Sequence, residues 1–235
     1  MPFSIKSQHK TVHTNMLWEG YYNSFPIDKK FSLLSDAQIR TREWSQHWSQ
    51  MLVRSGLSYK VNEQIAVTGG FAFFKNAQYA NKELFLKNEY RPWQEFFYQS
   101  KLKKINLTQR LRTEQRFQQQ IINDQISKTY QYIFRLRYRF EAQFPLRSNI
   151  IAFLVANEIM VNPGHINNTL FFDQNRSFAG INIKMQPNTA LQFQYVKIFQ
   201  WHSTTRVLEN QDVIRVNVFQ QLSSKKNIKN KKRFV

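Results

Sequence analysis

Polar and apolar residues alternate with a period of two along most of the chain. Between residues 130 and 140 every second residue is large and apolar or aromatic, whereas Arg135, Arg137 and Arg139 stand between them. A β-strand sends alternate side chains to opposite faces of its sheet, so this segment predicts a strand with one apolar and one charged face. A helix would instead spread these arginines around its circumference.

The same alternation recurs in segment after segment. In residues 105–117 the apolar side chains share one face, while the opposite face is polar and carries Arg110, Arg112, Glu114 and Arg116. Eleven strands are predicted in this way, at residues 15–24, 31–43, 49–61, 64–75, 84–99, 104–118, 129–143, 149–161, 171–185, 189–201 and 212–221. They predict one all-β domain over residues 15–221. An N-terminal extension or extra strand precedes it over residues 1–14, and a basic tail follows over residues 222–235.

Short and long connections alternate between these strands. Short turn signals lie at residues 26–28, 61–63, 103–104, 145–149 and 187–188, and longer polar gaps at 75–82, 118–128, 162–169 and 202–211. Short turns at one end and longer loops at the other are typical of an outer-membrane barrel. We therefore expect a single closed antiparallel transmembrane β-barrel of 10–12 strands. Bacterial single-chain barrels have even strand numbers. Either residues 5–12 supply a twelfth strand, or two of the eleven segments belong to one strand.

Strand length and aromatic content favour a membrane barrel over a soluble β-sandwich or soluble barrel. The predicted strands span about 10–15 residues, whereas strands of soluble proteins centre on about 5–6. Phe, Tyr and Trp make up 15% of the chain. The soluble alternative explains the alternation equally well, but it explains these two features less well.

The ends of the chain and its cysteine content bear on localisation. No apolar run approaches the ~20 residues that a membrane helix needs. Residues 1–10 are polar and show no signal-peptide core, although an outer-membrane protein needs a signal peptide. There is no cysteine, so disulfides and thiolate metal sites are excluded. The location expected from the strands is the bacterial outer membrane, with outer-membrane lipids as partners.

Several segments resemble a family of bacterial outer-membrane barrels, domain of unknown function (DUF) family 2490. The motifs that carry the resemblance are Asn88-Glu-Tyr-Arg-Pro-Trp-Gln-Glu95, Arg110-Leu-Arg-Thr-Glu-Gln-Arg-Phe117, Phe134-Arg-Leu-Arg-Tyr138, Asn157-Glu158 and Phe172-Asp-Gln-Asn-Arg176. Their order and spacing agree over about Trp18 to Phe219. The second motif is the most specific of them. The resemblance implies a location and a barrel shape, and it implies no activity.

The polar faces of the strands provide the main candidate site. The residues expected to face the lumen are Glu89, Arg91, Glu95, Arg110, Arg112, Glu114, Arg116, Arg135, Arg137, Arg139, Glu158 and Arg176. They could form a basic pore constriction or an anion-binding lumen. Alternatively, they could form salt bridges that fill the interior and keep a narrow barrel from collapsing, and we favour this structural role. The expected function is an outer-membrane barrel with a narrow or plugged lumen, and a small anion-preferring channel is an alternative.

Aromatic residues near the predicted strand ends are candidates for a girdle at the lipid headgroups. They are Trp18, Tyr22, Tyr59, Tyr79, Trp93, Tyr98 and Trp201. Ordinary core packing is the alternative for each of them.

Two further classes of function receive less support. A membrane-embedded lipid-modifying enzyme would need a nucleophile and a base. Three histidines, His47, His165 and His202, fall in or beside predicted loops, but no Gly-x-Ser-x-Gly elbow is present. A net charge of +19 suggests nucleic-acid binding, yet six of these charges lie in the tail Lys225 to Arg233 and no zinc or RNA-binding signature accompanies them. We expect no nucleic-acid partner, no cofactor and no metal.

Overall fold

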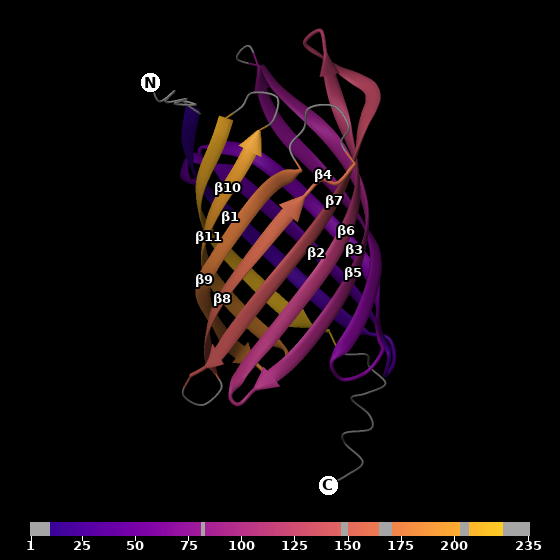
Figure 1. Ribbon diagram of the computed structural model, residues 1–235, viewed down its shortest axis with the longest axis vertical. Helices are drawn as coiled ribbons and strands as arrows, with labels where there is room; N and C mark the ends of the chain where they lie inside the picture. The colour runs from indigo at the N-terminus through magenta and orange to yellow at the C-terminus, as the bar shows by residue number, and fades with distance from the viewer. Residues whose placement is uncertain (1–9, 81–82, 147–149, 165–170, 203–206, 223–235) are drawn as a thin grey trace, which may run out of the picture.

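The computed structural model is a closed barrel of eleven β-strands (Figure 1). It describes residues 10–80, 83–146, 150–164, 171–202 and 207–222. The strands are β1 (Lys10–Pro26), β2 (Phe31–Arg42), β3 (His47–Lys60), β4 (Ile65–Ala80), β5 (Glu83–Leu102), β6 (Ile105–Ile122), β7 (Gln125–Pro145), β8 (Ile151–Val161), β9 (Phe172–Gln186), β10 (Thr189–His202) and β11 (Val207–Gln221). A single 3-10 turn, η1 (Glu43–Ser45), joins β2 to β3. The predicted fold, one closed barrel of 10–12 strands, is confirmed.

The barrel closes through a parallel pair of strands. Consecutive strands pair antiparallel, whereas β1 pairs with β11 in parallel, from Lys10 beside Val207 to Ser24 beside Gln221. An odd number of up-and-down strands makes the first and the last strand run in the same direction, so their pairing has to be parallel. The expectation of a barrel that is antiparallel throughout is therefore corrected at this one seam.

Strands at the end of the barrel opposite the short turns are longer than predicted. β4 continues to Ala80, and β6 and β7 meet at a tight turn in which Asn123 and Asp124 have φ of 52° and 55°. Positive φ at both central residues is the requirement of a type I′ hairpin turn. The gaps predicted at 75–82 and 118–128 are thus mostly strand, and β1 begins at Lys10 rather than at residue 15. Of the candidate twelfth strand, residues 5–9 lie outside the described residues, and Lys10–Val12 belong to β1.

The outer face of the barrel is apolar, whereas the bore carries the charged side chains together with a buried apolar cluster around Trp18 that includes Met16, Phe178 and Val196. Glu89, Glu114 and Glu158 point into the bore and are each 1% exposed, whereas Phe96 and Leu111 on the outer face are each 43% exposed. The difference between the two faces follows from the strand period of two, because each side chain points either into the bore or outward. No helix in the described part of the chain is long and apolar enough to cross a membrane.

Candidate functional site

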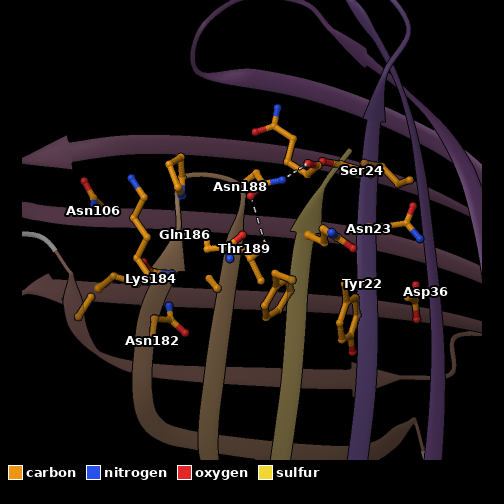
Figure 2. A pocket seen from close by; sticks show the side chains of 18 of the residues that line it. Tyr22, Asn23, Ser24, Asp36, Asn106, Asn182, Lys184, Gln186, Asn188 and Thr189 are labelled. Carbon is orange, nitrogen blue, oxygen red and sulfur yellow. Dashed lines mark hydrogen bonds between the residues drawn. The ribbon is translucent and has the colours of Figure 1, made fainter. Parts of the chain in front are cut away.

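Two of the cavities in the described part of the chain follow one another along the bore. One has a volume of about 1340 Å³ and opens at the end of the short turns, where Lys101, Lys104 and Asn188 line it. Figure 2 shows Tyr22, Lys184 and Asn188 around this cavity. The other has a volume of about 570 Å³, and twelve of its lining residues are arginines. We call them the turn-end cavity and the arginine cavity.

Four residues line both cavities and mark the constriction between them: Tyr22 of β1, Arg54 of β3, Trp93 of β5 and Arg112 of β6. The guanidinium carbons of Arg112 and Arg54 lie 4.5 and 5.6 Å from the centre of the Trp93 ring. Such cation–π contacts fix the orientation of the ring. This large indole and the two long arginines therefore stand between the two cavities.

The indole of Trp93 lies against two glycines of the neighbouring strands. A Cβ atom at Gly56 would approach Trp93 Cζ2 to 2.7 Å, and one at Gly70 would approach it to 2.6 Å. Both distances are shorter than side chains tolerate, so the missing side chains make room for the ring. The paired glycines thus explain how Trp93 lies inside a crowded barrel.

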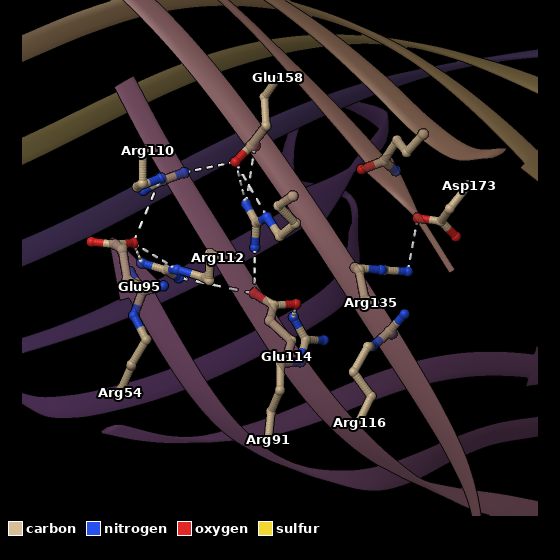
Figure 3. A network of polar contacts seen from close by, with 12 residues as sticks. Arg54, Arg91, Glu95, Arg110, Arg112, Glu114, Arg116, Arg135, Glu158 and Asp173 are labelled. Atoms are coloured by element: carbon tan, nitrogen blue, oxygen red, sulfur yellow. Dashed lines mark hydrogen bonds and ion pairs between the residues drawn. The ribbon is translucent and has the colours of Figure 1, made fainter. Parts of the chain in front are cut away.

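A continuous ion-pair network lines the wall formed by β5 to β8 (Figure 3). Glu114 lies 2.6 Å from Arg137 and 3.0 Å from Arg91. Glu158 lies 2.9 Å from the same Arg137 and 2.7 Å from Arg110. Arg137 thus bridges two buried carboxylates, as a planar guanidinium with several donors can.

The network extends along β5 and β6 toward both ends of the bore. Glu89 lies 2.6 Å from Arg91 and 2.6 Å from Arg116. At the other end Glu95 lies 2.5 Å from Arg112. Side chains on one face of adjacent strands lie close enough for such pairing, so alternation on each strand assembles the network.

Two of the predicted lumen arginines pair with acids that the prediction did not include. Arg135 lies 2.8 Å from Asp173, and Arg139 lies 2.5 Å from Glu141. Asp36, which holds Arg54 at 2.7 Å, was also not included. The signal for Glu141 was present in the sequence, because it alternates in phase with the arginines of its strand.

Arg176 is the one predicted lumen residue without an ion pair in the described structure. Its Nε donates to Gln174 Oε1 at 2.6 Å, and its guanidinium carbon lies 5.1 Å from the centre of the Trp18 ring. Arg40 covers the same ring at 4.1 Å. Neither Trp18 nor Arg40 was predicted to belong to the lumen site. Trp18 is only 4% exposed.

The predicted aromatic girdle is wrong for four of its seven members. Trp18, Tyr22, Trp93 and Trp201 line the bore, whereas Tyr59, Tyr79 and Tyr98 lie on outward-facing strand positions. Trp93 alternates in phase with the charged residues of β5, so its sequence pattern already indicated the polar face. The inner face of β1 carries no charged residue between Met16 and Tyr22, so its pattern gave no such sign.

Metal-ligating and basic side-chain types also occur outside the ion-pair network. No group of three His, Asp or Glu side chains there could hold a metal ion. His47 lies 3.4 Å from Glu43 at the end of the barrel opposite the short turns, and both side chains are largely exposed. His165 lies outside the described residues, as does the Lys225–Arg233 tail.

A closed barrel with an apolar outer face and an ion-paired bore has the architecture of a porin-like barrel. Residues 15–209 match the family described as "Protein of unknown function (DUF2490)", and the chain belongs to this family. The resemblance seen in the sequence is thereby confirmed.

A solved structure described as the NanC porin has a similar fold. It superposes with a TM-score of 0.52 over 88% of this chain and 99% of its own chain. Sequence identity is 13%, so the likeness concerns the fold alone. No curated protein matches the sequence.

Proposed function

We propose that this protein is an outer-membrane β-barrel of a Gram-negative bacterium whose constricted bore carries little steady current. The outer face supports the membrane location, because large apolar residues point outward along the strands. Examples are Phe96, Leu111, Tyr138, Phe153, Ile159 and Phe193, all 40–43% exposed. A closed sheet also pairs its backbone groups internally, as a bilayer requires.

The constriction between the two cavities is the observation that carries the proposal of a narrow bore. The turn-end cavity and the arginine cavity have only four lining residues in common, so we infer that the bore is restricted at their junction. Here Trp93 is held by Arg54 and Arg112 at mid-bore, and the ion pairs of β5 to β8 hold the long arginine side chains in place. In an open, water-filled porin channel these side chains would have to adopt conformations that leave the centre of the bore free.

Planar-bilayer conductance of the refolded chain tests this proposal. The wild-type protein is expected to give little steady current, and Trp93→Ala to raise it by removing the ring between the cavities. Tyr98→Ala, which removes an aromatic side chain from the outer face of the same strand, serves as the control and should change the current little. Large, stable wild-type channels would overturn the proposal.

A second candidate, a small anion-preferring channel, rests on the charge of the arginine cavity. Its lining holds twelve arginines but three acids, Glu114, Glu158 and Asp173. Any residual current should therefore be carried mainly by anions. The reversal potential in a potassium chloride gradient distinguishes this candidate from a sealed barrel or from a pore without charge preference.

A further inference from the structure

Two tryptophans in the bore each lie against two arginines, but the two clusters differ in charge. In the Trp93 cluster both arginines have carboxylate partners, since Arg54 lies 2.7 Å from Asp36 and Arg112 lies 2.5 Å from Glu95. The charge of the Trp93 cluster is therefore balanced within the chain. The Trp18 cluster is different.

The arginines that cover Trp18 are held by neutral amide oxygens. Arg40 donates to Gln50 Oε1 at 2.7 Å and to Gln38 Oε1 at 3.0 Å. Arg176 donates to Gln174 Oε1 at 2.6 Å. An amide oxygen accepts a hydrogen bond but carries no net negative charge. Glu158, the register partner of Arg176, forms its ion pairs with Arg110 and Arg137 instead.

A third arginine adjoins this cluster. Arg215 of β11 is the register partner of Trp18 across the parallel seam, as Arg40 is across the β1–β2 pair. It donates to Gln194 Oε1 at 3.3 Å and to the Tyr22 hydroxyl at 2.5 Å. Among the described residues no carboxylate forms an ion pair with Arg40, Arg176 or Arg215, although every other arginine of the arginine cavity has one.

Two donors at the cluster also lack acceptors. The indole Nε1 of Trp18 and the Nε of Arg40 are buried, and neither has a hydrogen-bond partner in the described structure. A buried donor without a partner costs free energy, and so does a group of like charges without a counter-charge. A negatively charged group in the cavity would relieve the second of these costs.

We propose that Arg40, Arg176 and Arg215 bind a small oxyanion, such as a carboxylate or sulfate, beside the edge of Trp18. All four residues line the 570 Å³ arginine cavity, so the ligand enters the bore from the end opposite the short turns. Guanidinium groups bind carboxylate and sulfate oxygens through paired, charge-assisted hydrogen bonds. This binding site is independent of whether the bore conducts, because it needs access from one end only.

Calorimetric titration of the refolded full-length chain in detergent micelles tests the proposal. Sodium sulfate and sodium acetate are titrated separately at one fixed ionic strength, so that the two arms distinguish an inorganic oxyanion from a carboxylate. At least one of the two is expected to bind with a stoichiometry of one. Arg40→Gln and Arg215→Gln should each weaken that binding about tenfold or more, the loss expected for one charge-assisted hydrogen bond.

Arg135→Gln provides the matched control. Arg135 lines the same cavity and loses the same charge, but in the wild type it is balanced by Asp173 at 2.8 Å. The Kd of the Arg135→Gln variant for the anion should stay within about threefold of the wild-type Kd. This change is smaller than the loss of one hydrogen bond would cause. Heat-modifiable migration on a gel verifies that each variant forms the barrel.

Two results would overturn the proposal. One is the absence of saturable binding of both anions to the folded wild-type chain. The other is an equal loss of affinity in Arg40→Gln, Arg215→Gln and Arg135→Gln, because attraction by the summed charge of the bore would then explain the binding. Neither result depends on the conductance of the bore.

Discussion

The carboxylate of Glu114 lies 2.6 Å from the guanidinium of Arg137 inside the bore, joining neighbouring strands β6 and β7. Arg91 of β5 contacts the other oxygen of the same carboxylate at 3.0 Å. One buried acid thus links three strands. Its loss would leave two guanidinium groups facing each other where surrounding side chains exclude most water.

Glu114→Gln is therefore expected to destabilise the barrel severely. Removing one partner of a buried ion pair costs about 3–5 kcal/mol. Arg91 and Arg137 keep Glu89 and Glu158 as counter-charges, so the loss should lie at the lower end of this range. The free energy of unfolding of the protein in lipid vesicles, measured by urea titration, checks this value. Glu63→Gln serves as the control: Glu63 pairs with Lys60 in an exposed turn, and such pairs contribute about 1 kcal/mol or less. Equal losses in the two variants would argue against a stabilising network.

A lipid-facing band predicts that charge is tolerated poorly on the outer face. Leu111 is 43% exposed on the outside of β6, between Phe96 of β5 and Tyr138 of β7. Leu111→Arg should cost about 2–4 kcal/mol if this part of the strand meets the bilayer midplane. Ile27→Arg, in the exposed turn between β1 and β2, should cost well under 1 kcal/mol. Unfolding titrations in vesicles compare the two, and equal costs would be inconsistent with a lipid-facing stripe.

The fold was predictable because polar and apolar residues alternate with a period of two in every strand that has one charged face. The strand ends opposite the short turns were not predictable. Residues 118–128 are mainly polar on both faces, so the alternation that marks a strand disappears although β6 and β7 continue to the turn at Asn123 and Asp124. Backbone pairing of the hairpin, which needs no particular side chain, maintains the strand there.

The ion-pair network was largely visible in the sequence, whereas the Trp18 cluster was not. Glu114 and its arginine partners alternate with apolar residues along their strands, and this alternation places them on the inner face. Trp18, Arg40 and Arg215 each stand on a different strand, and Trp18 has no charged neighbour in phase on β1 between Met16 and Tyr22. Only the register across the β1–β2 and β1–β11 pairs brings them together, and that register joins residues nearly 200 positions apart. The pattern of residues within one strand cannot predict such a contact.

Two adjacent glycines of β4 should respond in opposite ways to the same substitution. A Cβ at Gly70 would collide with Trp93 Cζ2 at 2.6 Å and with the backbone of β3, whereas a Cβ at Gly69 meets no atom within 4 Å. Gly70→Ala is therefore expected to cost about 1–3 kcal/mol through overpacking. Gly69→Ala should change the free energy of unfolding by about 0.5 kcal/mol or less. Urea unfolding of both variants measures the difference, and a tolerated Gly70→Ala would contradict the placement of Trp93 across the glycine pair.

Arg40→Gln should behave unlike the loss of any paired arginine in the bore. The substitution gives up a cation–π contact with Trp18 at 4.1 Å, which contributes about 0.5–2 kcal/mol. It also removes a charge that has no carboxylate partner and is repelled by Arg215, Arg91 and Arg137. Relief of a buried charge without a carboxylate partner is expected to be the larger effect. In the absence of sulfate and acetate, the free energy of unfolding should stay unchanged or rise by about 1 kcal/mol.

Arg54→Gln is the matched comparison, because Arg54 also lies over a bore tryptophan but holds Asp36 at 2.7 Å. It should lose about 3 kcal/mol or more, since Asp36 is then left buried without its counter-charge. Urea unfolding of the two variants side by side gives the contrast. An equally large loss in Arg40→Gln would mean that Arg40 is balanced by a negative group within the chain, and the charge excess around Trp18 would then be absent.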